Sequence, residues 1–162
     1  MQSKDTTIYS VTMEINGKQF QQFMEFEPQN INPADPDEYY YIYSYHYLIY
    51  LVNKCMVSCL TGLVALTTCP TNLAPTMTMD PNSQKCTLNL NSSYGYNQST
   101  KINIYFNSAI YAIFASLPAC MVNKNVLGMD YQLNSLISQS PIALAQDYST
   151  TALWNPVSSI LT

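Results

Sequence analysis

The sequence predicts an α+β fold with antiparallel β-hairpins, one long and mostly buried helix, and one short helix. Three observations lead to this prediction. An Asn-Gly dipeptide separates two alternating segments near the N-terminus, and a long, mostly apolar run with helical spacing lies at 38–66. Short strand-like segments then follow in no regular alternation with helices, which favours α+β over a doubly wound sheet.

The chain contains an unusually small number of charged residues. The 162 residues suffice for one domain, or for one domain and an arm; 48% are apolar, 10% are charged, and the net charge is −4. All basic residues are Lys, so a basic footprint for direct nucleic-acid binding is missing. High hydrophobicity with low net charge also excludes a disordered chain. The surface must be covered by uncharged polar groups and by the 14 Tyr, which favours association with other chains.

Residues 8–27 are predicted to form a β-hairpin. Asn16-Gly17 is the dipeptide preferred for a type I′ turn, since both central residues need positive φ. A two-residue loop sets the pairs Ile15–Lys18, Met13–Phe20, Val11–Gln22 and Tyr9–Met24. On the second strand Phe20, Met24 and Phe26 share one face, which is expected to pack on a core.

A Pro-rich linker at 28–37 leads into the long helix. Asp35-Pro36 suits a helix N-terminus, and the acidic cluster at 35–38 is interpreted as helix capping; a metal site is the alternative. The early Tyr run could instead begin as a strand. The polar side chains fall within one arc of a helical projection, which Tyr50 and Val57 share; these are His46, Asn53, Lys54, Ser58 and Thr61. A helix with so narrow a polar face is predicted to be buried on most sides.

The rest of the chain predicts short elements. A second hairpin is expected from 76–79 and 85–90, a third β segment at 101–106, and a short helix at 108–117 with Asn107 as its N-cap. Residues 121–128 are interpreted as a turn or loop, 129–136 as a strand or helical turn, and 154–156 as a turn. The expected organisation is a hairpin at 1–27, the linker, an α+β core at 38–137, and a C-terminal extension at 138–162. An element starts near the last residues, which indicates a truncated part of a longer polypeptide.

Few residues in the sequence could take part in catalysis or bind a metal or cofactor. His46 is the one histidine, and no glycine-rich, nucleophile-elbow or metalloprotease motif occurs, so an enzyme is disfavoured and no cofactor or metal is expected. The five Cys are interpreted mainly as reduced, buried residues, and Cys55 and Cys59 as core packing rather than metal ligands. Glu25 and Glu27 share a strand face and could hold a cation, although an exposed face is the simpler interpretation. No signal peptide and no membrane span are expected.

The tyrosines suggest two kinds of contact. Tyr94, Tyr96 and Asn97 lie in a loop rich in Tyr, Asn, Ser and Gly, the composition of an adaptable binding surface, so this loop is a candidate receptor or glycan contact. Tyr40, Tyr43 and Tyr47 belong to the Tyr-rich start of the long helix and are candidate assembly contacts. Two Asn-x-Ser patterns at Asn91 and Asn97 are interpreted as chance matches in an Asn/Ser-rich chain.

The order of the elements carries a resemblance. After the Tyr-rich helix come the segments 74–81, 85–90, 102–107 and 154–157, and this pattern resembles viral structural proteins of the capsid or minor-capsid type. The resemblance spans 39–162 and implies a non-enzymatic virion component, with a jelly-roll-like β framework as an alternative architecture. The long helix departs from a standard jelly roll, eight strands are not countable in the sequence, and a basic arm for packaging a genome is absent.

The leading hypothesis is therefore a viral or phage structural protein. It is expected to assemble with its own copies or with other virion proteins through uncharged, Tyr-rich surfaces, in the host cytoplasm or nucleus. The hairpin edges are natural places for strand addition by a neighbour. The alternatives are a receptor- or glycan-binding module such as a fibre tip, and an enzyme or toxin with an unrecognised site.

Overall fold

Nine β-strands and two α-helices make up the described parts of the chain. The structure is a computed structural model, and it describes residues 5–27, 44–82, 85–95, 98–114, 119–124, 128–133, 142–148 and 154–157. In chain order the elements are β1 (Asp5–Ile15), β2 (Lys18–Phe26), α1 (Tyr45–Leu66), β3 (Thr76–Met79), β4 (Lys85–Leu90), the 3₁₀ turn η1 (Ser92–Tyr94), β5 (Asn103–Phe106), α2 (Ser108–Ile113), β6 (Ala119–Lys124), β7 (Gly128–Leu133), β8 (Ile142–Tyr148) and β9 (Trp154–Val157).

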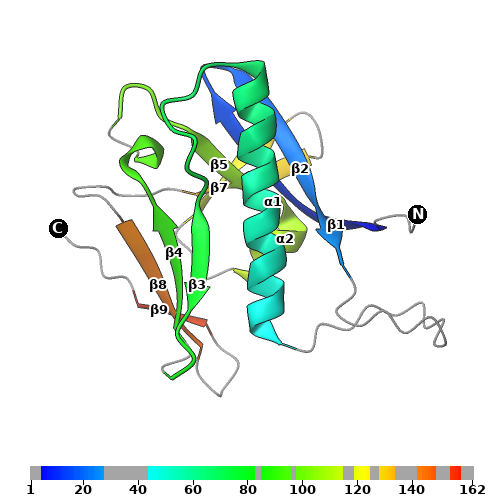
Figure 1. The fold of residues 1–162 in the computed structure, drawn as a ribbon, viewed down its shortest axis with the longest axis vertical. Coiled ribbons are helices and arrows are strands. Elements are labelled where there is room, and N and C mark those ends of the chain that lie inside the picture. Colours follow the sequence, from blue (N-terminus) through cyan, green and yellow to red (C-terminus); the bar gives the residue numbers. More distant parts are fainter. Residues whose placement is uncertain are drawn as a thin grey trace.

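The strands form two antiparallel sheets, with α1 running along one side of both (Figure 1). The first sheet has the order β2-β1-β5-β7-β6 and the second has the order β3-β4-β8-β9. Helix α1 packs on β2, β1 and β3, so it spans the edge strands of both sheets. The predicted α+β class, with one long and one short helix, is confirmed.

The first hairpin has the predicted turn and, near that turn, the predicted register. Asn16 and Gly17 have φ of 50° and 76°, as a type I′ turn requires. Ile15 pairs with Lys18, and the register continues unchanged along both strands to the Val11–Gln22 pair.

Farther from the turn the hairpin departs from the prediction. The Tyr9–Met24 pair is wrong, because the register of β1 against β2 shifts just before Ser10. At this point β1 is held by Asn107, the residue between β5 and α2. Its main-chain N–H donates to the Ser10 carbonyl (3.2 Å), its Oδ1 accepts from the Ser10 N–H (3.2 Å), and its Nδ2 donates to the Ile8 carbonyl (2.7 Å). With β5 on its other side, β1 is an inner strand, and only β2 is an edge of the predicted hairpin.

Helix α1 begins later than predicted. Its N-cap is Ser44, which has an extended backbone (φ −152°, ψ 150°) and whose Oγ accepts from the Tyr47 N–H at 3.3 Å. The helix therefore starts at Tyr45 rather than at residue 38. The predicted linker, the predicted cap at 35–38 and the Tyr run before Ser44 lie outside the described residues.

The end of α1 at Leu66 agrees with the prediction, even though Gly62 is a poor helix former. The edge of the Phe20 ring of β2 lies so close to Gly62 that a Cβ added there would overlap it. A side chain at this position would force the Phe20 ring to move, so glycine permits the close approach of helix and strand, and it does not end the helix.

The core lies between the two sheets and the inner face of α1. Sheet residues that alternate along β1, β4 and β5 point into it, as their period-2 pattern predicts. The fully buried side chains with the largest volumes include Met13, Ile15, Met24, Leu51, Met56, Leu63, Leu88, Leu90, Ile102, Phe106, Ile110 and Phe114.

Three predictions for the second half of the chain are wrong. Residues 119–124 form strand β6 rather than a loop, and 154–157 form strand β9 rather than a turn. Helix α2 ends at Ile113, four residues earlier than predicted, and Phe114 is its C-cap. The segment at 138–162 contributes β8 and β9 to the second sheet, where β8 pairs with β4 from Lys85–Asp147 to Leu90–Ile142.

Candidate functional site

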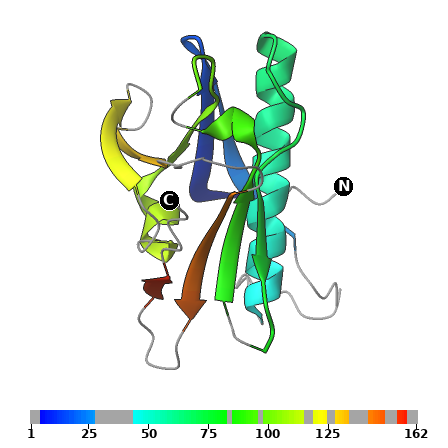
Figure 2. The same ribbon diagram turned by 90° about the vertical axis from the view of Figure 1, so that its left-hand side faces the viewer.

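The outer face of α1 exposes apolar side chains along its length. Tyr50 and Val57 are each 50% exposed and Val64 is 43% exposed, and the three are seven residues apart. Figure 2 shows α1 along one side of the molecule, with both sheets on its inner side. His46, Ser58 and Thr61, predicted on the polar arc, are exposed on α1 as expected, in the same arc as Tyr50 and Val57.

This exposed apolar character continues past the end of the helix. Leu66 is 56% exposed and Leu73, in the segment before β3, is 64% exposed. The sequence has no Lys, Asp or Glu between Lys54 and Asp80. We refer to Tyr50, Val57, Val64, Leu66 and Leu73 as the uncharged surface. Tyr50, Val57 and Val64 share one side of α1, whereas Leu66 is the last residue of the helix and Leu73 belongs to the segment that follows. Large exposed apolar patches mark interaction sites more often than single exposed side chains do.

An ion pair flanks the uncharged surface. The Nζ of Lys54 forms a hydrogen-bonded ion pair with the Oε1 of Glu27, which follows β2. This hydrogen bond is the main reason why the pKa of Lys54 is raised. The charge of Lys54 is thus engaged by the chain itself, and the predicted shared face of Glu25 and Glu27 lies beside this lysine.

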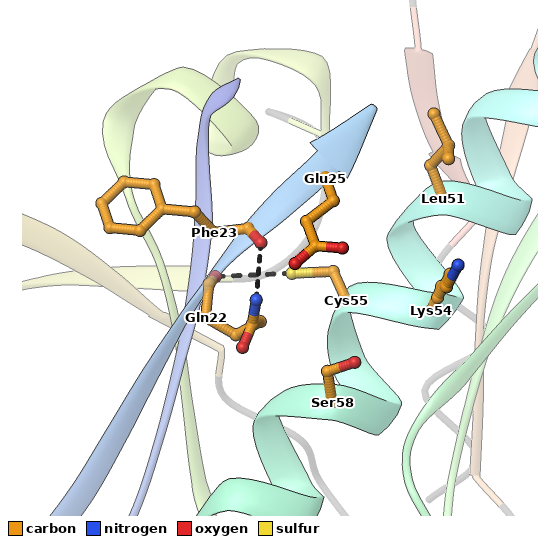
Figure 3. Close-up of a pocket in the computed structure, with 7 residues that line it drawn as sticks. All are labelled: Gln22, Phe23, Glu25, Leu51, Lys54, Cys55 and Ser58. Atoms are coloured by element: carbon orange, nitrogen blue, oxygen red, sulfur yellow. Dashed lines mark hydrogen bonds between the residues drawn. The ribbon is translucent and has the colours of Figure 1, made fainter. Parts of the chain in front are cut away.

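A shallow hollow separates α1 from β2 next to this ion pair (Figure 3). Its cavity volume of about 20 Å³ is close to the room needed by one water molecule. Ligand pockets are more than ten times larger, at about 300–1,000 Å³. The hollow is lined by Gln22, Phe23, Glu25, Leu51, Lys54, Cys55 and Ser58. It does not provide a substrate site, and His46 does not line it.

Asn53 has a role that its sequence pattern did not reveal. Its Nδ2 donates to the Met77 carbonyl at 2.8 Å, and its Oδ1 accepts from the Met77 N–H at 2.7 Å. The side chain therefore pairs with the edge strand β3 as a neighbouring strand would. The helical projection placed Asn53 on the polar arc, but it contains no signal for a partner 24 residues away.

The predicted assembly tyrosines are only partly described. Tyr47 is half-buried; its ring stacks on Tyr50 with centroids 6.0 Å apart and meets Phe26 edge-on at 6.2 Å. Its hydroxyl oxygen is buried and has no hydrogen-bond partner among the described residues. Burial, followed by the nearby Glu27 charge, raises the pKa of Tyr47. Tyr40 and Tyr43 lie outside the described residues.

One residue of the predicted contact loop, Tyr94, is buried. Tyr94 is 4% exposed and belongs to η1, and its hydroxyl donates to the Leu73 carbonyl at 2.9 Å. Burial raises the pKa of Tyr94. The structure therefore gives Tyr94 a packing role. Tyr96 and Asn97 lie outside the described residues.

Cys55, Cys59 and Cys86 are free thiols that are buried, and Cys69 is a free thiol that is partly exposed. Cys59 donates to the Phe20 and Val11 carbonyls at 3.2 and 3.4 Å, and Cys55 donates to the Gln22 carbonyl at 3.4 Å. Burial raises the pKa of both thiols to about 12. The predicted packing role of Cys55 and Cys59 agrees with these contacts.

The face of the first sheet that points away from the core carries a polar network. Glu14 Oε2 accepts from the Tyr105 hydroxyl at 2.8 Å and from Asn103 Nδ2 at 3.5 Å, and Gln132 Nε2 donates to Asn103 Oδ1 at 3.2 Å. These bonds join β1, β5 and β7 across the sheet. Within the described ranges, no group of three or more His, Cys, Asp and Glu side chains is arranged to hold a metal ion.

Helix α1 also satisfies the length and hydropathy requirements of a membrane span. It has 22 residues and a mean hydropathy of 1.7 over its most apolar window, half of which is buried in the fold. A core helix with this burial meets the same requirements, and its contacts with three strands account for the apolar character of its inner face.

Comparison with known proteins identifies one family and one fold. A family profile described as Sputnik minor capsid protein V18/19 matches residues 1–162. The fold is similar to a chain in the 3.5 Å cryo-EM structure of the Sputnik virophage, with a TM-score of 0.76 and 23% identity. That similarity covers 93% of this chain and 49% of the virophage chain, so this chain spans about half of the virophage chain's length. No curated protein matches the chain.

Proposed function

The chain belongs to the Sputnik minor capsid protein V18/19 family, and we propose that it joins a virion shell through its uncharged surface. The family gives the chain a viral structural role and a place in the virion. The finer statement, that assembly uses the uncharged surface, is supported by the exposure of these five side chains, four of which lie in the stretch between Lys54 and Asp80 that has no Lys, Asp or Glu.

The mechanism is burial of apolar area between subunits. Burial of exposed valine and leucine side chains lowers the free energy of association by about 25 cal/mol for each Å² of apolar surface removed from water. Lys54 lies between Tyr50 and Val57 on the helix, and its charge is paired with Glu27. A neighbouring protein that covers Val57, Val64, Leu66 and Leu73 therefore meets a paired lysine at the margin of the contact rather than a free charge.

The shape of the molecule supports the same role. Helix α1 lies on one side of the molecule, and the core and both sheets lie on the other (Figure 2). A contact on the outer face of α1 leaves the core packing unchanged. The small hollow beside β2 offers no competing function as a ligand site.

Incorporation into particles tests this proposal. Val57→Glu and Val64→Glu place a charge on the uncharged surface without touching a buried residue, and Ala112→Glu does the same at an exposed position of α2. We expect the two valine variants to fold normally by circular dichroism and to be depleted in purified virions. The α2 variant should be incorporated like the unmodified chain. Incorporation of all three at the unmodified level would refute the proposal.

A receptor or glycan contact at the loop of residues 91–100 stays a prediction. Because Tyr94 is buried, we propose Tyr96 and Asn97 as the residues that make such a contact. Replacing both with Ala should then reduce attachment to host cells while leaving particle assembly intact. Attachment at the unmodified level would remove this second candidate.

A further inference from the structure

Strand β2 is an edge of the first sheet, and the direction of its backbone groups follows from the turn before it. A two-residue type I′ loop makes the residues on either side of it a hydrogen-bonded pair. Hydrogen-bonded and non-hydrogen-bonded pairs alternate along an antiparallel ladder, so Phe20 and Gln22 bond to β1. The N–H and C=O groups of Gln21 and Phe23 therefore point away from β1, to the open side of the sheet.

The contacts of β1 agree with this assignment. Phe23 is opposite Ser10 in the register, and Ser10 uses both of its backbone groups on its other side, where they bond to Asn107. Phe23 and Ser10 therefore form a non-hydrogen-bonded pair, as the alternation from the turn requires.

Three of the four outward groups have no hydrogen-bond partner among the described residues. These are the N–H and C=O of Gln21 and the N–H of Phe23, which we call the β2 edge. The Gln21 side chain does not cover them, because its Nε2 donates to the Ser10 hydroxyl at 3.0 Å. The fourth group, the Phe23 carbonyl, accepts from Gln22 Nε2 at 2.9 Å (Figure 3). Open backbone groups of this kind are a template for pairing with another extended chain.

Helix α1 packs on two edge strands but closes only one of them. On β3, the Asn53 amide bonds to both the N–H and the C=O of Met77, and so takes the place of a further strand. On β2, the thiols of Cys55 and Cys59 donate to carbonyls that face β1 and not to the outward groups. The β2 edge is therefore the one that the helix leaves accessible.

The hollow between β2 and α1 limits which side chains fit beside this edge. A strand added here would point every second side chain towards α1, and the residue opposite Gln22 would be one of these. That side chain would enter the hollow, which Gln22 and the exposed Ser58 line (Figure 3). The volume of about 20 Å³ admits a group about the size of one water molecule, such as the side chain of Ala or Ser.

The other face of the edge favours an apolar neighbour. The Phe23 ring points away from α1 and is partly exposed (Figure 3). The residue opposite Phe23 in an added strand would lie on this face, where an apolar or aromatic side chain packs on the ring. The complementary chain is therefore an extended segment with a small residue next to an apolar one.

We propose that the β2 edge binds an extended segment of a neighbouring virion protein, which becomes a sixth strand of the first sheet. The segment places Ala or Ser opposite Gln22 and an apolar residue opposite Phe23. The β2 strand of a second copy does not meet this requirement. Phe20, Gln22 and Met24 share the face of β2 towards α1, and each of them is larger than the hollow.

This inference rests on the proposed place of the chain in a virion shell, but it uses a surface separate from the uncharged surface. Its affinity comes from main-chain hydrogen bonds, and the uncharged surface contributes apolar area. Each contact can therefore be blocked without the other.

Hydrogen exchange of single amides measures strand addition directly. The amides of Gln21 and Phe23 are compared in the free chain and in purified particles, with those of Phe20 and Gln22, which bond to β1, as internal controls. We expect the first two amides to exchange about 100-fold more slowly in particles, because each gains a hydrogen bond to the added strand. The two controls should be protected in both states.

Two variants block the β2 edge in different ways. Gln21→Pro removes an outward N–H and keeps the bonds to β1, which is the placement at which an edge strand tolerates proline. Ser58→Trp fills the space beside the hollow from an exposed position of α1, and Ala112→Trp is the same change at an exposed position of α2. We expect the first two variants to be depleted from virions about tenfold and the α2 variant to be incorporated normally. If Gln21→Pro fails to fold by circular dichroism, Ser58→Trp carries the comparison.

Two outcomes overturn the inference. One is equal exchange of the Gln21 and Phe23 amides in free chains and particles, and the other is normal incorporation of Ser58→Trp. Val57→Glu separates this inference from the proposed function. Its depletion together with unprotected edge amides would keep the uncharged surface as the contact and remove the β2 edge. Its normal incorporation together with protected edge amides would remove the uncharged surface and keep the β2 edge.

Discussion

Replacing Asn53 with Ala should loosen the attachment of helix α1 to the second sheet. The Asn53 amide makes two short hydrogen bonds with the backbone of Met77, at 2.7 and 2.8 Å. Each bond contributes about 1 kcal/mol net, and a backbone group left partly buried without a partner adds a further penalty of about 1 kcal/mol or more. Alanine regains about 0.5 kcal/mol through its higher helix propensity. We therefore expect the free energy of unfolding to fall by about 2.5 kcal/mol.

The measurement is urea unfolding followed by circular dichroism, with amide hydrogen exchange at Met77 as the local readout. A loss of about 2.5 kcal/mol in a domain of this size lowers the melting temperature by roughly 5–10 °C. Asn89→Ala is the matched control: its amide also makes two bonds, to Thr76 and Thr78, but both are 3.3 Å long and exposed. The control should cost about 0.5 kcal/mol or less.

The Asn53→Asp variant provides a second test, through the pH dependence of its stability. The second carboxyl oxygen faces the Met77 carbonyl, where the amide of Asn53 donated a hydrogen bond. Repulsion between the two oxygens favours the protonated acid in the folded state, which raises the folded pKa of the introduced carboxyl above its unfolded value. The native state then binds more protons, so the stability of this variant falls as the pH rises from the unfolded pKa of about 4 through the folded pKa.

Two results would refute this reasoning. One is that Asn53→Ala lowers the free energy of unfolding no more than Asn89→Ala does, and leaves the protection of the Met77 amide against hydrogen exchange unchanged. The other is a pH dependence of Asn53→Asp that matches the unmodified chain. Either result would mean that β3 is held in place by its pairing with β4 and not by the helix.

Three further predictions concern other contacts of the core. Gly62→Ala should destabilise the fold by about 1–3 kcal/mol because its Cβ overlaps the Phe20 ring, and a Phe20→Leu background should recover part of this loss in urea unfolding. The native thiols of Cys55 and Cys59 should resist alkylation at pH 8, because burial raises the pKa of each from 9 to about 12. The free energy of unfolding should fall as the pH rises from 9 towards 12, because the native state then keeps protons that the unfolded state loses. Asn107→Ala should cost about 2 kcal/mol because it removes the α2 cap and the links to β1, whereas Asn107→Ser, which keeps a capping oxygen, should cost less when thermal unfolding is compared.

The sequence predicted the elements whose signals are local. The turn at Asn16-Gly17 and the strands beside it follow from the φ requirement of one dipeptide and from period-2 alternation. The hairpin of β3 and β4 follows in the same way, with the predicted bounds. Asn107 was predicted as an N-cap because it precedes an apolar helix, and its Oδ1 accepts from the Ile110 N–H at 3.1 Å.

Elements that depend on distant partners were missed. β8 pairs with β4 across more than 50 residues of sequence, and its own composition does not alternate clearly. The sequence also gave no reason to expect that Asn107 would bond to Ser10, 97 residues away, where the β1–β2 register shifts. The composition of its loop likewise gives no signal that the Tyr94 hydroxyl donates to a carbonyl 21 residues earlier. The start of α1 has a local signal in Ser44, a favoured N-cap residue, but the acidic cluster at 35–38 also has the composition of a helix N-terminus.

The shortage of charge has a different explanation in different parts of the fold. Asparagine side chains hold the backbone at several junctions: Asn53 at β3, Asn91 at η1 and Asn107 at β1. An amide both donates and accepts, so it can replace a strand or cap a helix, whereas a carboxylate only accepts and an ammonium only donates. The buried face of α1 accounts for further uncharged residues. Neither explanation applies to Val57 and Val64, because both are exposed and an apolar side chain forms no hydrogen bonds with the backbone. In a chain that uses its uncharged residues so consistently, these exposed positions are best explained by a partner that covers them.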